Sequence, residues 1–338
     1  PICESAVVSA ANGLSINGFK AVMEMQFADF VSTGFNPIVN LLAKQHYRWQ
    51  EKSDVVVRMP CGGGTQAGPF HSQTNEAWFT KTPGLKVVYP AFPYDAKGLL
   101  NTSINDPNPV LFFEHKALYR SISAEVPDEY YQIPMGKAKL VTEGEDACII
   151  TYGMGVIWAQ QYQENHPSVA ISILDLRSLA PLDYEAIREV VKATGKVCIL
   201  HEDNLTGGIG GEISAWISEH CFAYLDAPIM RCASLDTPIP FNLELEKQYG
   251  PFDYAIGHSL GGMSILNALK QNLKVKKAVI IGSGDIIQDI LEDFVKKVDS
   301  LELVNTFNKY NIKKGRISNK YDLLKQRNGI IYRLVLLC

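Results

Sequence analysis

The sequence predicts an α/β protein in which strands alternate with helices and build mostly parallel sheets. Three observations predict this class: short β-branched runs, segments with helical spacing between them, and glycine or proline where the runs end. The chain has 338 residues, of which 46% are hydrophobic and 20% charged, so it has enough apolar material for two or three domains.

The first alternating unit occupies the N-terminal part of the chain. Residues 5–19 are small and apolar and predict a packed helix, and residues 22–31 predict a strand that runs into a turn. The expected helices and strands that follow are at 36–49 (helix), 55–60 (strand), 85–90 (strand), 96–106 (helix) and 109–115 (strand). This order favours a parallel sheet with crossover helices.

A second unit of the same kind follows a polar segment with two prolines, residues 121–135, which suits a linker. Strands and helices again alternate, at 146–153, 157–165, 170–177, 184–193, 196–203 and 210–221. The character of the chain changes after about Tyr249, where a strand, a tight turn and a helix are expected, followed by a second strand at the segment KKAVIIG.

Composition excludes several classes of protein. The net charge of −4 gives no support for nucleic acid or an anionic membrane as a partner. The seven cysteines are scattered without a C-x-x-C, which favours reduced thiols in a cytosol or a mitochondrial matrix. No apolar run is long enough to cross a membrane, and no signal peptide is recognisable. The chain opens at Pro1, not at Met, and we expect that the true N-terminus is missing.

Three residues are candidates for chemistry. Glu4 follows P-I-C and begins a helix, Phe30 closes the segment QFADF, and His71 follows a glycine-rich loop. Each also has an ordinary structural interpretation, as a helix N-terminal carboxylate, a core aromatic and a structural histidine. The glycine spacing fits neither a dinucleotide-binding loop nor a phosphate-binding Walker loop.

The motifs become specific when they are taken together and in order. PICE, EMQFADF, GGGTQAGPFHSQ, PGLKVVYP and NDPNPVLFFEHKALYR resemble the pyrimidine-binding domain in beta subunits of thiamine-diphosphate-dependent 2-oxo acid dehydrogenases. ILDLRSLAPLD, HEDNLTGGIGGEI and RCASLDTPIPF resemble the C-terminal domain of these subunits. The resemblance implies a transketolase-like pyrimidine-binding domain at 1–120, truncated at its start, and a transketolase C-terminal-like domain at 136–248.

The resemblance also implies roles for the three candidates. The cofactor, thiamine diphosphate, would lie between this chain and an alpha chain. Glu4 would hydrogen-bond a ring nitrogen of the cofactor's aminopyrimidine, and an apolar cleft would raise the pKa of Glu4 by desolvation. Phe30 would pack on the pyrimidine, and His71 would assist acyl transfer to lipoamide.

Metal sites are expected to leave little trace in this sequence. Branched-chain members hold potassium largely by main-chain carbonyls, which implies the positions Val55, Val56, Ser103, Asp106 and Asn108. The alternative is that Asp106 and Asn108 only form a solvated turn. The sequence lacks the GDG-type motif with a later Asn, so magnesium is expected to be bound by the partner.

The resemblance implies partners and a location as well. We expect an alpha subunit in a heterotetramer, a lipoyl acyltransferase core, and a 2-oxo acid substrate, with the branched-chain acid favoured over pyruvate. The location would be the cytoplasm of a bacterium or the mitochondrial matrix of a eukaryote.

The C-terminal part has a different resemblance. The segment GHSLGG at 257–262 is a G-x-S-x-G nucleophile elbow, and residues 251–299 resemble a fragment of an α/β-hydrolase. Ser259 has no histidine after it, because the last one in the chain is His258, so we expect no hydrolase activity. No linker separates the two parts at 245–251, and residues 300–338 remain unassigned. We favour an artefact of sequence assembly or gene prediction as the origin of the junction. The alternatives to a functional dehydrogenase subunit are a nonfunctional chimera and a serine hydrolase.

Overall fold

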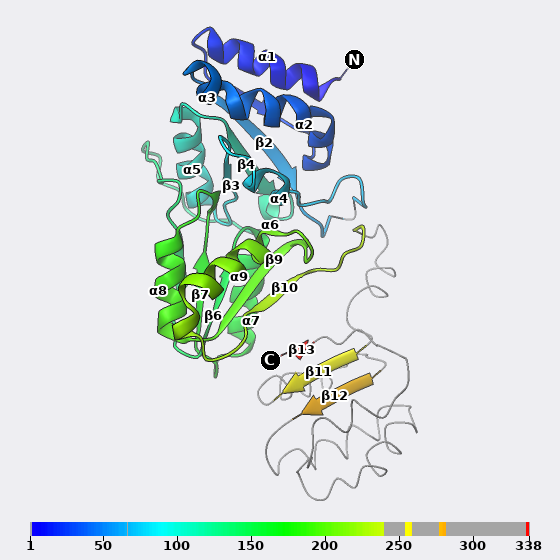
Figure 1. Cartoon of the computed structure of the whole chain (residues 1–338), viewed down its shortest axis with the longest axis vertical. Coiled ribbons are helices and arrows are strands. Elements are labelled where there is room, and N and C mark those ends of the chain that lie inside the picture. Colours follow the sequence, from blue (N-terminus) through cyan, green and yellow to red (C-terminus); the bar gives the residue numbers. More distant parts are fainter. Residues whose placement is uncertain (1, 66, 240–253, 259–276, 282–335, 338) are drawn as a thin grey trace, which may run out of the picture. The chain divides into compact units, whose positions relative to one another are not determined.

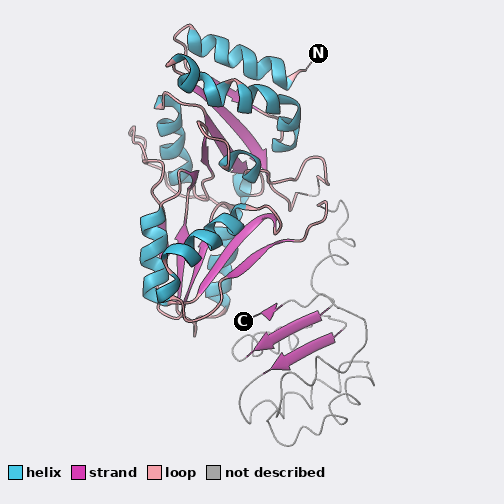
Figure 2. Cartoon of the chain, viewed as in Figure 1, coloured by secondary structure: helices cyan, strands magenta, loops and turns pink. Residues whose placement is uncertain are grey.

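The computed structural model describes residues 2–65, 67–239, 254–258, 277–281 and 336–337. The chain divides into two compact units, residues 1–243 and 244–338, and each is described by itself. The first unit contains two five-stranded sheets with helices packed on their faces (Figure 1 and Figure 2). The expected α/β class with mostly parallel sheets is confirmed.

The first sheet has the strand order β1-β2-β4-β3-β8. Strands β1 to β4 are parallel, and all residues of β4 and all but Arg58 of β2 are buried, which fits their largely apolar sequences. The bounds of the strands are β1 (Ala21–Glu24), β2 (Val55–Cys61), β3 (Lys86–Val88), β4 (Val110–His115) and β8 (Ser178–Ala180). The helices of this half are α1 (Glu4–Ile16), η1 (Ala28–Phe30), α2 (Val31–Asn40), η2 (Leu42–Lys44), α3 (Gln45–Trp49), α4 (Ala77–Thr80), α5 (Pro93–Asn105) and α6 (Leu118–Ser121).

The second sheet has the strand order β10-β9-β6-β7-β5, and only the pairing of β5 with β7 is antiparallel. Its strands are β5 (Lys139–Thr142), β6 (Ala147–Thr151), β7 (Ile171–Asp175), β9 (Val197–Asn204) and β10 (Met230–Ser234). Its helices are α7 (Met154–Asn165), α8 (Tyr184–Thr194), α9 (Ile209–His220) and η3 (Phe222–Tyr224). This matches the predicted alternation, with short edge strands in addition.

The predicted helix at 36–49 is wrong in its bounds. Helix α2 begins five residues earlier, at Val31, and the chain then continues through η2 into a separate helix α3. Gly34 lies within this early part of the helix, and an added Cβ there would lie 3.1 Å from Met25 Cε and 3.5 Å from Glu4 Cβ. The glycine therefore serves close helix packing here and does not end the helix. The predicted strand at 22–31 is likewise shorter, because β1 ends at Glu24.

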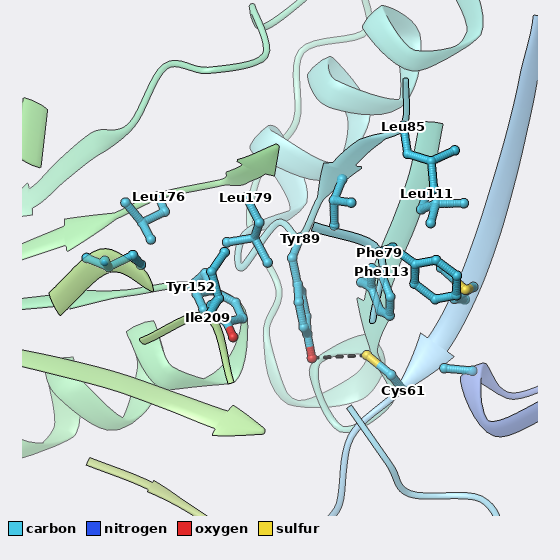
Figure 3. Packing of buried hydrophobic residues seen from close by; sticks show 14 of the residues in the cluster. Cys61, Phe79, Leu85, Tyr89, Leu111, Phe113, Tyr152, Leu176, Leu179 and Ile209 are labelled. Carbon is cyan, nitrogen blue, oxygen red and sulfur yellow. Dashed lines mark hydrogen bonds between the residues drawn. The ribbon is translucent and has the colours of Figure 1, made fainter. Parts of the chain in front are cut away.

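The two sheets of the first unit are joined by strand β8. This strand follows β7 in the sequence, yet it pairs antiparallel with β3 of the first sheet, Val87 opposite Ala180 and Val88 opposite Ser178. A single hydrophobic cluster extends across the junction (Figure 3). In it, Tyr89 lies between the two halves and its hydroxyl is hydrogen-bonded to the thiol of Cys61 at 3.0 Å.

In the second unit, the structure describes the residues of three strands. β11 (Tyr254–His258) pairs in parallel with β12 (Lys277–Ile281) and with β13 (Leu336–Leu337). The first two strands lie where the sequence predicts them. Ser259 and most of 251–299 and 300–338 lie outside the described residues, so the hydrolase-like fragment stays a prediction. In the part of the chain that the structure describes, no helix has the length and apolar character needed to cross a membrane.

Candidate active site

Glu4 occupies the first position of α1, where the helix dipole favours a carboxylate. Close packing of α1 on α2 at Gly34 brings the side chain of Glu4 over the beginning of α2. The hydroxyl of Thr33 lies 2.7 Å from Glu4 Oε2 and 2.9 Å from the carbonyl oxygen of Phe30. Thr33 thus connects the carboxylate of Glu4 to the segment that carries Phe30.

In the chain by itself the pKa of Glu4 is not raised; the expected rise concerns the cleft shared with an alpha chain and stays a prediction. The pKa of Glu4 is lowered, first by the hydrogen bond from Thr33 and then by the amide of Glu4 itself, and desolvation opposes this shift only weakly. The physical reason is that the carboxylate of Glu4 lies at the surface of the chain.

Phe30 and His71 belong to one aromatic cluster. The ring of His71 lies 5.6 Å from that of Phe30 and 4.8 Å from that of Phe27, both edge to face, and the two phenylalanines are 5.7 Å apart. Edge-to-face rings at these separations attract each other. The structure therefore brings together two residues that are 41 positions apart in the sequence, and Thr33 extends this group to Glu4.

His71 is carried by a loop that has several anchors. We call residues 62–65 and 67–73 the His71 loop. The ammonium of Lys116 is hydrogen-bonded to the carbonyl oxygen of His71, and Asp29 Oδ1 accepts a hydrogen bond of 2.9 Å from Gln73 Nε2. Among the described residues, no hydrogen bond reaches an imidazole nitrogen of His71. The backbone is therefore held while the ring nitrogens stay available.

A cavity of about 480 Å³ adjoins this cluster at the carboxyl ends of β1, β2 and β4. Ligands of parallel α/β sheets bind at this edge of the sheet. Phe27 and Lys116 line the cavity and also contact His71. Burial lowers the pKa of Lys116, whose ammonium lies 5.3 Å from the centre of the Phe27 ring. The other lining residues are Glu24, Gln26, Arg58, Pro60, Thr65, Tyr119 and Arg120.

The positions suggested for potassium lie in and around β2 and the end of α5. Asp106 Oδ1 accepts hydrogen bonds from the amide and the side chain of Asn108, and its other oxygen pairs with Lys86. The carbonyl oxygen of Ser103 accepts the amide of Asp106, and Val55 and Val56 are buried strand residues. These bonds form the turn that was the alternative interpretation. They do not test main-chain ligation of a cation, which stays a prediction.

Several residues of the site could not be singled out from the sequence. Thr33, Phe27 and Asp29 lie within or just after the QFADF motif, and Lys116 directly follows the buried strand β4. Polar residues at the ends of parallel strands were the available signal for Lys116. Nothing in the local sequence around 33 indicates that its hydroxyl meets Glu4, because that contact depends on how two helices cross.

Comparisons with known proteins agree with this arrangement. The model of the transketolase pyrimidine-binding domain matches residues 1–121, and that of the transketolase C-terminal domain matches residues 136–256. Among solved structures, "Split gene transketolase, inactive beta4 tetramer" superposes with a TM-score of 0.59 at 23% identity, over 74% of this chain and 77% of that one. At this identity the likeness concerns the fold alone.

Curated relatives are more similar. The 2-oxoisovalerate dehydrogenase subunit beta of Bacillus subtilis is 46% identical over 74% of this chain and 78% of its own length. The mitochondrial 2-oxoisovalerate dehydrogenase subunit beta of Dictyostelium discoideum is 44% identical over 74% of this chain and 69% of its own length. The pyruvate dehydrogenase E1 component subunit beta of Acholeplasma laidlawii is 40% identical over 71% and 75%.

The fold and the site thus define a chain built from the two transketolase-type domains. The chain belongs to the family of 2-oxo acid dehydrogenase beta subunits.

Proposed function

We propose that this chain is the beta subunit of a 2-oxo acid dehydrogenase and acts with an alpha partner in oxidative decarboxylation, with acyl transfer to lipoamide. The observation that carries the proposal is the connection from Glu4 through Thr33 and Phe30 to His71. A carboxylate, an aromatic ring and an imidazole with available nitrogens are the groups that this chemistry requires from the beta chain.

Thiamine diphosphate fits the residues that the chain offers for its pyrimidine end. Glu4 presents a surface carboxylate for a ring nitrogen, and Phe30, whose backbone carbonyl shares the hydroxyl of Thr33 with Glu4, presents a half-buried ring. When bound, the cofactor supplies the nucleophilic carbon and the electron sink for decarboxylation. Among the described residues, no group of His, Cys, Asp or Glu side chains could hold a metal ion. We propose that magnesium and the diphosphate are bound by the alpha partner.

We assign His71 to the second half of the reaction. The oxidised lipoyl disulfide takes up the acyl unit with two electrons, so that one sulfur becomes acylated and the other leaves and needs a proton. An imidazole is suited to donate that proton near neutral pH. Potassium would require the main-chain oxygens around Val55, Val56, Ser103, Asp106 and Asn108, and it remains part of the proposal.

The favoured substrate is the branched-chain acid 2-oxoisovalerate, with pyruvate next, because relatives acting on 2-oxoisovalerate reach 46% identity and those acting on pyruvate 40%. The experiment is co-expression with the alpha subunit of a 2-oxoisovalerate dehydrogenase and measurement of kcat/KM for both acids with an artificial electron acceptor. We expect activity with a higher kcat/KM for 2-oxoisovalerate. A stable complex with neither activity would overturn the proposed function, and a preference for pyruvate would overturn the favoured substrate.

A further inference from the structure

The carboxylate of Glu202, at the end of β9 in the second sheet, reaches the start of the His71 loop. Its Oε1 accepts a hydrogen bond of 2.7 Å from the amide of Gly63, and its Oε2 lies 2.7 Å from Nε2 of His115. Gly63 and Glu202 are 139 positions apart in the sequence. One side chain of the second sheet therefore holds both the loop and the end of β4.

The hydrogen bonds of His115 define its role. The amide of Ala117 donates to Nδ1 at 3.2 Å, so Nδ1 carries no proton and Nε2 donates its proton to Glu202. His115 is 3% exposed, so its ring cannot turn toward water without opening the junction. Glu202 is thus an acceptor on both oxygens, which a carboxylate satisfies and an amide does not.

Backbone geometry strengthens this anchor. Gly62 has φ +90°, and an added Cβ would lie 2.1 Å from His115 Nε2, so the loop begins in direct contact with the imidazole. The next residue after His115 is Lys116, whose ammonium holds the carbonyl oxygen of His71. The end of β4 is therefore linked to the backbone of His71 through the side chain of Lys116.

We propose that Glu202 is a positioning residue for His71, acting through Gly63 and His115, so that the second sheet sets the geometry of acyl transfer. This rests on the proposed function for the role of His71. Misplacement of a reacting group by about 1 Å can cost about a hundredfold in rate. Loss of the anchor should therefore reduce acyl transfer more than decarboxylation, which does not require His71 to donate a proton.

The test compares two rates in the complex with the alpha subunit: 2-oxo acid-dependent reduction of an artificial acceptor, and acylation of free lipoamide. In Glu202→Gln and His115→Phe we expect the ratio of lipoamide acylation to acceptor reduction to fall about ten- to a hundredfold. His115→Gln keeps a donor toward Glu202 and should recover most of the ratio. Glu219→Gln, an exposed carboxylate on α9, is the matched control and should not change it.

A second measurement does not depend on activity. Amide hydrogen exchange of the full-length chain, followed by mass spectrometry, should accelerate in the His71 loop of Glu202→Gln while the strands β2 and β9 stay protected. An unchanged rate ratio with unchanged loop exchange would overturn the inference. A wild-type complex that lacks both rates would instead overturn the proposed function, and the exchange result would still decide whether Glu202 anchors the loop.

Discussion

The hydroxyl of Tyr152 is hydrogen-bonded to Oε1 of Glu76, and this buried bond connects the two sheets of the first unit. Burial, together with the nearby charge of Asp203, raises the pKa of Glu76 from 4.5 to about 8. The other oxygen, Oε2, has no hydrogen-bond partner among the described residues. The raised pKa favours the neutral form of Glu76 at neutral pH.

This relationship predicts a pH dependence of stability. The folded chain keeps the proton of Glu76 up to about pH 8, whereas the unfolded chain releases it near pH 4.5. The folded state therefore binds more protons in this window, and the free energy of unfolding should decrease as pH rises through it, by at most about 1.4 kcal/mol per pH unit. Glu76→Gln removes this titrating group. The free energy of unfolding of the variant should therefore match that of the wild type near pH 4.5 and exceed it increasingly toward pH 8.

The measurement is urea unfolding at several pH values. Glu219→Gln, in which an exposed carboxylate is neutralised, serves as the control and should follow the wild-type curve closely. Parallel curves for wild type and Glu76→Gln would show that Glu76 is already ionised in the folded chain.

A second prediction concerns the titration of Glu4. Because the hydrogen bond from Thr33 is the largest cause of its lowered pKa, Thr33→Val should raise the pKa of Glu4. Thr33→Ser keeps the hydroxyl and should leave the pKa close to that of the wild type. The pKa can be followed by the carboxyl carbon resonance of Glu4 in the chain without its partner. An identical titration in Thr33→Val would mean that the hydroxyl does not act on Glu4 in solution.

The sequence was informative about the order of elements and less so about their contacts. Parallel strands buried on both faces, such as β2 and β4, appear in the sequence as β-branched and aromatic runs, which made them predictable. Strand β8 has three residues, too few to show a periodic pattern, and its pairing with β3 depends on the tertiary fold.

In the site, too, residues within motifs were predictable from the sequence, whereas contacts between distant residues were not. Glu4, Phe30 and His71 were identified by their motifs, because motif and residue lie together in the sequence. Glu202 was not, since its contact with Gly63 spans 139 positions and carries no local signal. The direction of the Glu4 pKa shift in the chain by itself could not be predicted, because it depends on exposure, which the motif does not encode.

A third prediction concerns the buried ion pair at the other side of the junction. Arg177 donates to Asp95 Oδ1 at 2.9 Å, and Asp95 is 0% exposed. Arg177→Met would leave this buried carboxylate with only the ammonium of Lys139, 3.9 Å away, as a charged partner, which should lower the free energy of unfolding by up to about 3–5 kcal/mol. Arg188→Met is the matched control, because Arg188 pairs with Glu185 at the surface. This substitution should lower the free energy of unfolding by less than about 1 kcal/mol. Equal losses in the two variants, measured by urea unfolding, would contradict this assignment.

A fourth prediction concerns the nucleophile elbow. Since no histidine follows Ser259 in the sequence, the hydroxyl has no base of the usual α/β-hydrolase order to activate it. The full chain should not hydrolyse a p-nitrophenyl ester above the level of Ser259→Ala. A rate that disappears in Ser259→Ala would revive the serine hydrolase hypothesis.

The most direct measurement of the central claim compares Glu4→Ala and His71→Ala in the complex with an alpha subunit. Both 2-oxo acid-dependent reduction of an artificial acceptor and acylation of lipoamide are followed. The account predicts that Glu4→Ala loses both rates, and that His71→Ala loses lipoamide acylation by about a hundredfold or more while it retains more of acceptor reduction. Full activity of both variants in both assays would contradict it.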